Sequence, residues 1–205
     1  MGGHGSAPYR AKDPVLAAAN MVTAIQLAVT REFDVLDPVV VTTGSLHGGT
    51  VHNVIPDEAT FSSTVRSFSA AAREKLLEVL PRVCRGVALA HGVDVDVDLQ
   101  PLFPPTINDV SEAQWALDLA RQQLGGSRVV ELPSPMTASE DFSRFLNAVP
   151  GALLFLGATP HGLDPASAPF NHAPEADFDE SVLTTGAELL ASLALERLRL
   201  EQPVS

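Results

Sequence analysis

Residues 59–67 read Ala-Thr-Phe-Ser-Ser-Thr-Val-Arg-Ser, and this stretch decides how the first half of the chain is built. The alternation sets Phe61, Ser63 and Val65 against Ser62, Thr64 and Arg66. A period of two predicts a β-strand with one buried and one polar face. The sequence on either side therefore has to supply a partner strand and an apolar cover.

Both are present. Residues 39–43 are β-branched and end in Gly44, which predicts a second strand that stops at this glycine. Residues 70–90 carry apolar side chains on one helical stripe, and Gly92 follows, as is typical of a helix with a glycine cap.

Two further elements complete the first half. Asp13-Pro14 predicts an N-cap and a first helical position, so we expect a helix over residues 14–31. Residues 93–99 alternate valine with aspartate, which predicts a strand with one solvated face. The order helix, strand, strand, helix, strand is that of a ferredoxin-like βαββαβ unit that lacks its first strand.

Residues 101–105 contain three prolines, which disfavour both helix and ladder pairing. We therefore expect a domain boundary here, with one domain over 1–105 and another over 106–205. In the second domain Ser111 and Gln114 match a capping box that would open a helix. The remaining pattern predicts, in order, a strand at 127–132, a short helix at 139–147, a strand at 152–156 and a helix at 179–198. This alternation favours an α/β sheet with parallel strands covered by helices.

Composition excludes some functions. The formal net charge is −12, with 13 basic and 25 acidic residues, so neither nucleic acid nor an anionic membrane is an expected partner. No apolar run reaches the length of about 18 residues that a membrane-spanning helix needs, and no export signal is visible. We therefore expect a cytoplasmic protein. Cys84 is the single cysteine and lies in an apolar helical pattern, which favours a buried structural residue.

Four short segments could carry chemistry. Gly2-Gly3-His4-Gly5-Ser6 opens the chain, and the Gly48-Gly49 pair precedes Asn53-Val54-Ile55-Pro56. Ser139-Glu140-Asp141-Phe142 is the third, and the fourth places His172 just upstream of the acidic residues at 177, 179 and 180. In this order and at these separations, the segments resemble the zinc-dependent amidohydrolases and peptidases that include aminoacylase, hippurate hydrolase, indole-acetyl-amino-acid hydrolases and carboxypeptidase G.

The resemblance implies a metal-dependent hydrolase that cleaves the amide bond of N-acyl amino acids or related peptides. It implies two zinc ions, with manganese or cobalt as alternatives. It also implies that the predicted domain over 1–105 is the family's lid domain, through which a homodimer forms. The family's Cys-Gly-His-Asp and Glu-Glu metal-binding motifs do not occur in this sequence. We therefore expect the C-terminal portion of such an enzyme, which is the lid plus the last part of the α/β catalytic domain, and no activity from this portion alone.

The resemblance also implies roles for five residues. His172 matches a metal ligand, and His4 matches a lid histidine that donates a hydrogen bond to the scissile carbonyl in the partner subunit. Asn53, Arg66 and Glu140 match positions near the substrate. Without the resemblance, each has an ordinary explanation: a polar loop residue for His172, a flexible terminus for His4, a turn residue for Asn53, a solvated strand residue for Arg66, and a helix-dipole partner for Glu140. A non-catalytic dimerisation module derived from the same family is the alternative function.

Overall fold

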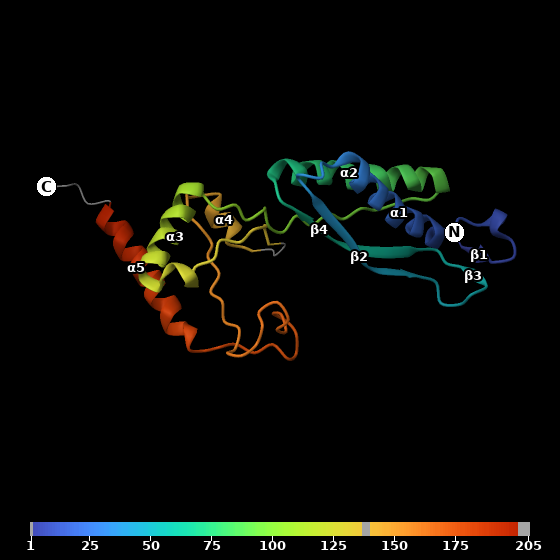
Figure 1. Ribbon diagram of the computed structural model, residues 1–205. Coiled ribbons are helices and arrows are strands. Elements are labelled where there is room, and N and C mark those ends of the chain that lie inside the picture. Colours follow the sequence, from blue (N-terminus) through green and yellow to red (C-terminus); the bar gives the residue numbers. More distant parts are fainter. Residues whose placement is uncertain (1, 137–139, 201–205) are drawn as a thin grey trace. The chain divides into compact units, whose positions relative to one another are not determined.

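The computed structural model describes residues 2–136 and 140–200 and divides into two compact units. One unit runs to Thr106 and includes Pro135–Arg144; the other comprises Ile107–Ser134 and the residues from Phe145 onward. Figure 1 shows the elements of each. The proposed domains over 1–105 and 106–205 stay a prediction, and each unit is described by itself below.

The first unit is a β-hairpin covered on one face by two helices (Figure 1). The hairpin pairs β2 (Val39–Gly48) with β4 (Ala59–Ser67), and the helices are α1 (Pro14–Glu32) and α2 (Ala70–His91). Their buried side chains form one core, namely Met21, Ile25, Val41, Leu76, Leu80, Cys84 and Ala88. The strand predicted over 59–67 is confirmed as β4, and Phe61 and Val65 pack against this core as expected. The alternation holds only in part, because Ser63 is exposed and Arg66 is half-buried.

The helix ends are set by the residues that the sequence indicated. Asp13 Oδ1 accepts hydrogen bonds from the Val15 and Leu16 amides, each at 3.0 Å, and Pro14 takes the first helical position. Gly92 ends α2 in the left-handed region with φ 64°, which a residue without a Cβ adopts at little cost. Both predicted caps are confirmed.

The prediction that the first strand stops at Gly44 is wrong. β2 continues to Gly48, and the pairing register shifts between Thr43 and Ser45. Gly44 therefore lies in a β-bulge, where the extra residue has no partner opposite it and the missing side chain removes a steric obstacle. A glycine inside a β-branched run marks a bulge here instead of an end.

The predicted strand at 93–99 is also not formed as a strand. Its side chains behave as expected: Val93, Val95, Val97 and Leu99 are half-buried against the core, and the residues between them are exposed. The backbone, however, has no ladder partner among the described residues. The alternation predicted which side chains face the core, but a strand also requires a neighbour, and a sequence pattern does not show whether one is present.

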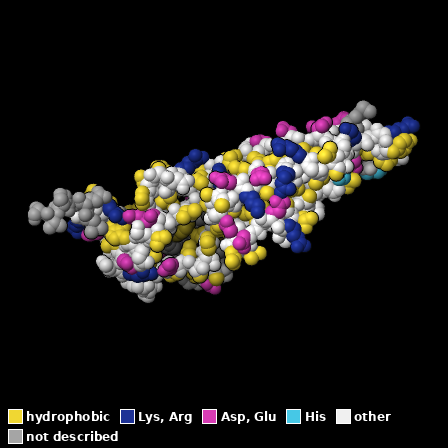
Figure 2. Space-filling model, turned by 90° about the horizontal axis from the view of Figure 1, so that it is seen from above, with side chains coloured by type: hydrophobic (Ala, Val, Ile, Leu, Met, Phe, Trp, Pro, Cys, Tyr) yellow, Lys and Arg dark blue, Asp and Glu magenta, His cyan; other side chains and the backbone are white. Residues whose placement is uncertain are grey.

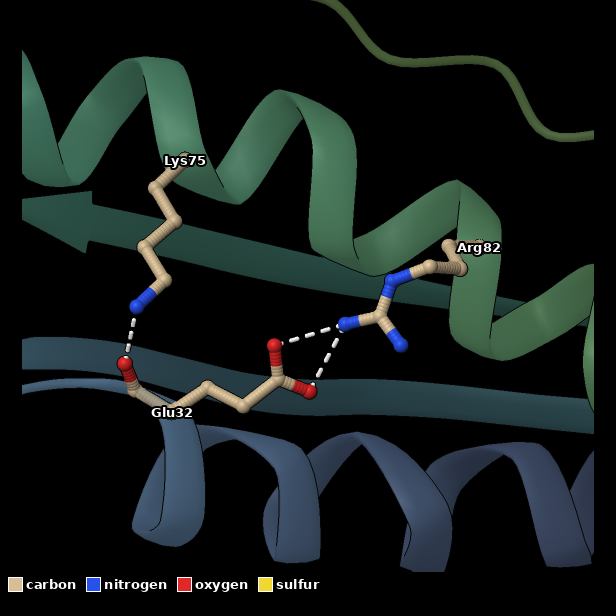
Figure 3. Close-up of polar contacts among 3 residues, drawn as sticks. All are labelled: Glu32, Lys75 and Arg82. Carbon is tan, nitrogen blue, oxygen red and sulfur yellow. Dashed lines mark hydrogen bonds and ion pairs between the residues drawn. The ribbon is translucent and has the colours of Figure 1, made fainter.

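A cluster of charged groups joins α1 to α2 (Figure 3). Arg82 Nη2 donates to both carboxylate oxygens of Glu32, at 2.7 and 2.6 Å, and Lys75 Nζ donates to the Glu32 carbonyl. The Glu32 carboxylate raises the pKa of Arg82 through this hydrogen bond and its charge. Because the cluster is exposed to solvent, its contribution to stability is small, while the Lys75 contact satisfies a carbonyl in the last turn of α1.

The second unit contains α3 (Val110–Leu124), the short 3₁₀ turn η2 (Gly126–Arg128) and α5 (Val182–Leu200). Ala116 and Ala120 of α3 are buried. The guanidinium of Arg197 in α5 lies 4.3 Å from the centre of the Trp115 ring and forms an ion pair with Glu112. These contacts tie α5 to α3.

Three predictions for this part of the chain need correction. The N-cap of α3 is Asp109, whose Oδ1 accepts from the Glu112 amide at 3.0 Å, so Ser111 lies inside the helix instead of capping it. The expected strands at 127–132 and 152–156 are absent from the described residues of this unit. The backbone of Leu153 instead bonds the Asn108 side chain, whose Oδ1 accepts at 2.8 Å and whose Nδ2 donates at 3.2 Å. One amide side chain thus substitutes for a neighbouring strand at a single residue.

The short helix predicted at 139–147 is α4 (Ser143–Leu146), and Ser139 lies outside the described residues. The described residues therefore form a mixed α/β chain. None of its described helices combines the length and the apolar character that crossing a bilayer requires. Seen from above the view of Figure 1, acidic and basic side chains are interspersed on the surface, with hydrophobic side chains exposed between them (Figure 2).

Candidate functional site

Two of the predicted site residues, His4 and Asn53, lie at one small antiparallel sheet. Its strands are β1 (Gly3–His4) and β3 (Val54–Ile55), with Gly3 opposite Ile55 and His4 opposite Val54. The pairing extends by one bond, from the Gly5 amide to the Asn53 carbonyl at 2.8 Å. The first residues of the chain and the turn after β2 are thereby joined, and both candidate side chains are exposed.

The glycines around His4 allow this close approach. A Cβ on Gly2 would lie 2.2 Å from the Ile55 carbonyl oxygen, and a Cβ on Gly5 would lie 3.1 Å from the Asn53 carbonyl oxygen. Both obstacles are backbone atoms, which cannot turn aside as a flexible side chain would. The Gly-rich segment therefore brings backbone, and with it Asn53, up to the histidine.

We expect Gly2→Ala to separate β1 from β3, because the new methyl group and the Ile55 carbonyl cannot occupy the same space. The measurement is hydrogen exchange of the Gly5 amide, which should become much faster than in the unmodified chain. Gly86→Ala is the matched control, since a Cβ there meets nothing within 4 Å and alanine favours the helix. A Gly5 amide equally protected in Gly2→Ala would contradict the close approach.

The ring of His4 is fixed by its own loop. Its Nδ1 lies 2.8 Å from Ser6 Oγ and accepts a hydrogen bond from the Ser6 amide at 3.2 Å. The Ala7 amide donates to the His4 carbonyl at 2.9 Å, which closes a turn that brings Ser6 back to the ring. The ring's other nitrogen, Nε2, has no hydrogen-bond partner among residues 2–136 and 140–200.

A pocket of about 320 Å³ lies beside this sheet. Val54, the register partner of His4, lines it together with the ionisable residues His47, Asp57 and Glu58. Asp57 Oδ1 also accepts from the Gly2 amide at 2.7 Å and so holds the start of the chain. Sequence reasoning assigned no role to these three residues, although the pairing of the two flanking strands is what brings them together.

Arg66 and Glu140 belong to the same unit as His4, but no described hydrogen bond or ion pair links either of them to the His4–Asn53 sheet. Arg66 is half-buried on β4, opposite Val40 of β2. The Glu140 carbonyl accepts from Ser143 Oγ at 2.6 Å and from its amide at 3.3 Å, which starts α4. Within the first unit, the structure thus brings together His4 and Asn53 but not Arg66 or Glu140.

His172 lies in the second unit, at the third position of a β-turn that the Ala173 amide closes on the Phe170 carbonyl at 3.0 Å. Its φ is 74°, and it is the one non-glycine residue with positive φ among the described residues. A turn of this kind ordinarily carries glycine or asparagine here, because a side chain is strained in the left-handed region. Histidine is one of the non-glycine residues enriched in this region, and the His172 side chain is exposed.

The sequence pattern suggested that the acidic residues after His172 start a helix. They do not, and α5 begins only at Val182. Asp179 precedes it, and its Oδ1 accepts from the Ser181 amide at 2.9 Å. Hydrogen bonds from Ser181, and then the nearby His161, lower the pKa of Asp179. His161 Nε2 lies 3.4 Å from Asp179 Oδ2, so the Asp179 carboxylate is engaged in local contacts.

The fit of a metal centre can be tested on the donor atoms. No group of three or more His, Cys, Asp or Glu side chains within the described ranges is placed to hold a metal ion. Structural and catalytic zinc sites need at least three protein ligands. The described residues therefore do not fit the two expected zinc ions, and His172 could supply one ligand at most.

Cys84 is buried in the core, and burial raises the pKa of its thiol, while the charge of Arg85 acts weakly in the opposite direction. As pH rises, the unfolded thiol loses its proton near its ordinary pKa of 9.0, before the folded one does. The free energy of unfolding should therefore fall above about pH 9. Urea unfolding at pH 8 and 10 measures this, with Cys84→Ala as the control for other groups. An equal decline in both proteins would show that the thiol is not responsible.

Residues 6–196 match the model of peptidase family M20/M25/M40. The chain is 36% identical over 201 residues to IAA-amino acid hydrolase ILR1-like 4 of Arabidopsis thaliana, covering 96% of this chain and 45% of the relative. It is 31% identical over 198 residues to hippurate hydrolase of Campylobacter jejuni, covering 97% and 50%.

The chain is also similar to solved structures. A putative aminohydrolase from methicillin-resistant Staphylococcus aureus superposes with a TM-score of 0.82 at 27% identity, over 96% of this chain and 49% of that one. A dinuclear metal-binding M20 peptidase from Bacillus subtilis gives a TM-score of 0.72 at 27% identity, over 91% and 46%. The chain belongs to peptidase family M20/M25/M40. It spans about half the length of the relatives that it matches.

Proposed function

We propose that this chain is the lid and C-terminal portion of a metal-dependent amidohydrolase that cleaves the amide bond of N-acyl amino acids or related peptides. The observation that carries the proposal is the paired placement of His4 and Asn53 at exposed positions of one small sheet beside a pocket. The names of the relatives support the substrate class, since they refer to hydrolysis of an amino-acid conjugate and of hippurate.

In this proposal each residue binds or orients the substrate. His4 donates a hydrogen bond from Nε2 to the carbonyl oxygen of the scissile amide, where negative charge develops in the transition state. Asn53 orients the same substrate from the neighbouring strand. Arg66 offers a planar guanidinium to the substrate carboxylate, and Glu140 lies at the edge of the site.

His172 would contribute one metal ligand, and the other ligands would come from residues outside this chain. No catalytic step through the metal follows from the residues present. The proposal also includes a ferredoxin-like lid over residues 1–105 and a homodimer formed through it. Among the described residues, neither the backbone of 93–99 nor the outer edge of β2 has a ladder partner, and such an edge can pair with another chain.

A chimaera tests the function. In hippurate hydrolase of Campylobacter jejuni, this chain would replace the matching half, and hydrolysis of N-benzoylglycine and N-acetyl amino acids would be measured with Zn²⁺ or Mn²⁺. We expect hydrolysis by the chimaera and none by the 205-residue chain alone. A chimaera that is folded, dimeric and metal-loaded but inactive would favour the non-catalytic dimerisation module.

A further inference from the structure

The contact between His4 and Ser6 determines which nitrogen of the His4 ring carries the proton. Two donors converge on Nδ1: the Ser6 hydroxyl, with Oγ at 2.8 Å, and the Ser6 amide, with its nitrogen at 3.2 Å. The hydroxyl alone would decide nothing, because it can donate to a bare nitrogen or accept from a protonated one.

The amide removes this ambiguity. A backbone N–H can only donate, so the nitrogen that it faces must present a lone pair. In a neutral imidazole one nitrogen carries hydrogen and the other does not. The neutral ring of His4 therefore carries its proton on Nε2, and the Ser6 hydroxyl must donate as well.

We infer that Ser6 is a positioning residue that holds His4 as the Nε2–H tautomer, ready to donate to an anionic or carbonyl oxygen. The donor role rests on the proposed function, whereas the tautomer is a property of this chain alone. The backbone on either side of the ring is held by hydrogen bonds, because β1 pairs with β3 and the Ala7 amide bonds the His4 carbonyl.

The same arrangement distinguishes the roles open to the two candidate histidines, His4 and His172. A metal ion needs a nitrogen lone pair, and on His4 the only lone pair of the neutral ring is already engaged by Ser6. His4 is therefore built to donate, whereas no described hydrogen bond engages either ring nitrogen of His172. A ligand at His4 would be an oxygen that accepts a hydrogen bond.

The test uses the whole ¹⁵N-labelled chain at a pH about two units above the ordinary histidine pKa, where imidazoles are neutral. Two-bond ¹⁵N–¹H correlations report the shifts of both ring nitrogens. A single tautomer gives a wide separation between them, and exchange between tautomers narrows it. His52, which is exposed and has no hydrogen bond to a described residue, is the internal reference.

We expect the separation for His4 to exceed that for His52, with Nε2 protonated. Ser6→Ala keeps the backbone donor at 3.2 Å but loses the closer hydroxyl at 2.8 Å, so the separation should narrow only in part toward that of His52, and Ser6→Thr should restore it. Protonation of Nδ1 in the unmodified chain would overturn the tautomer, and an unchanged separation in Ser6→Ala would overturn the positioning role of the Ser6 side chain. The unmodified chain decides the tautomer even if the Ser6→Ala loop is disordered.

Activity of the chimaera distinguishes failure of the proposed function from failure of the tautomer inference. If His4 has the expected tautomer, but His4→Ala leaves kcat of the active chimaera unchanged, then the positioning by Ser6 stands and the catalytic role of His4 is wrong. If the activity of the chimaera depends on His4 but the ring is protonated on Nδ1, then the catalytic role of His4 stands and the positioning by Ser6 is wrong.

Discussion

Replacing Leu76 with alanine is expected to lower the free energy of unfolding by about 2–5 kcal/mol. Leu76 is only 3% exposed and lies in the core cluster with Ile25, Val41 and Leu80. Truncation removes buried methyl groups and leaves a space that the two helices and the hairpin can fill only in part. Urea unfolding followed by helical circular dichroism measures the change as a shift in the midpoint.

Leu89→Ala is the matched control. Leu89 belongs to the same helix but is 84% exposed, so the same change in composition and helix propensity should alter stability by less than about 0.5 kcal/mol. Similar losses in the two variants would mean that α2 does not bury the face described here.

Replacing His172 with glycine is expected to abolish activity in the chimaera without lowering the stability of the chain. Glycine accepts φ 74° freely, whereas a residue with a Cβ bears about 1–2 kcal/mol in the left-handed region. The Gly variant should therefore be at least as stable as His172→Ala, which keeps the strain. In the active chimaera both variants should lose activity by more than about 100-fold, which is the upper range for residues that only support a metal ligand.

Two measurements check this second prediction: unfolding midpoints of the two variants in the 205-residue chain, and metal content with activity in the chimaera. Full metal occupancy and activity in the Gly variant would exclude His172 as a ligand. A Gly variant less stable than the Ala variant would show that the turn does not bear strain.

The sequence predicted the first unit better than the second, and the reason is physical. Caps and periodicity are local, so Asp13, Gly92 and the faces of both helices could be read directly. Strands depend on partners that local patterns do not contain. Thus 93–99 has the expected alternation of burial but no ladder among the described residues, and in 152–156 the Asn108 side chain bonds the backbone of Leu153 alone.

The candidate site shows the same limit. The glycines around His4 signalled a close approach, and the structure identifies the backbone of Ile55 and Asn53 as the partner. Nothing in the sequence near Phe170 signals a positive φ at His172, because the turn lacks the glycine that would usually mark it. Likewise, the resemblance indicated His4 but not the Ser6 contact, which depends on the path of the turn between them.

The stretch from Val93 to Leu99 has a consequence for dynamics. Its apolar side chains are held by the core, while its amides have no ladder partner among the described residues. The Val93 amide donates to the Ala88 carbonyl at 3.0 Å and should be protected from exchange. Beyond it, side-chain order and amide protection, which usually rise together in a strand, should be uncoupled: methyl groups should be as rigid as those of α2, while the amides from Asp94 to Leu99 exchange with solvent water quickly.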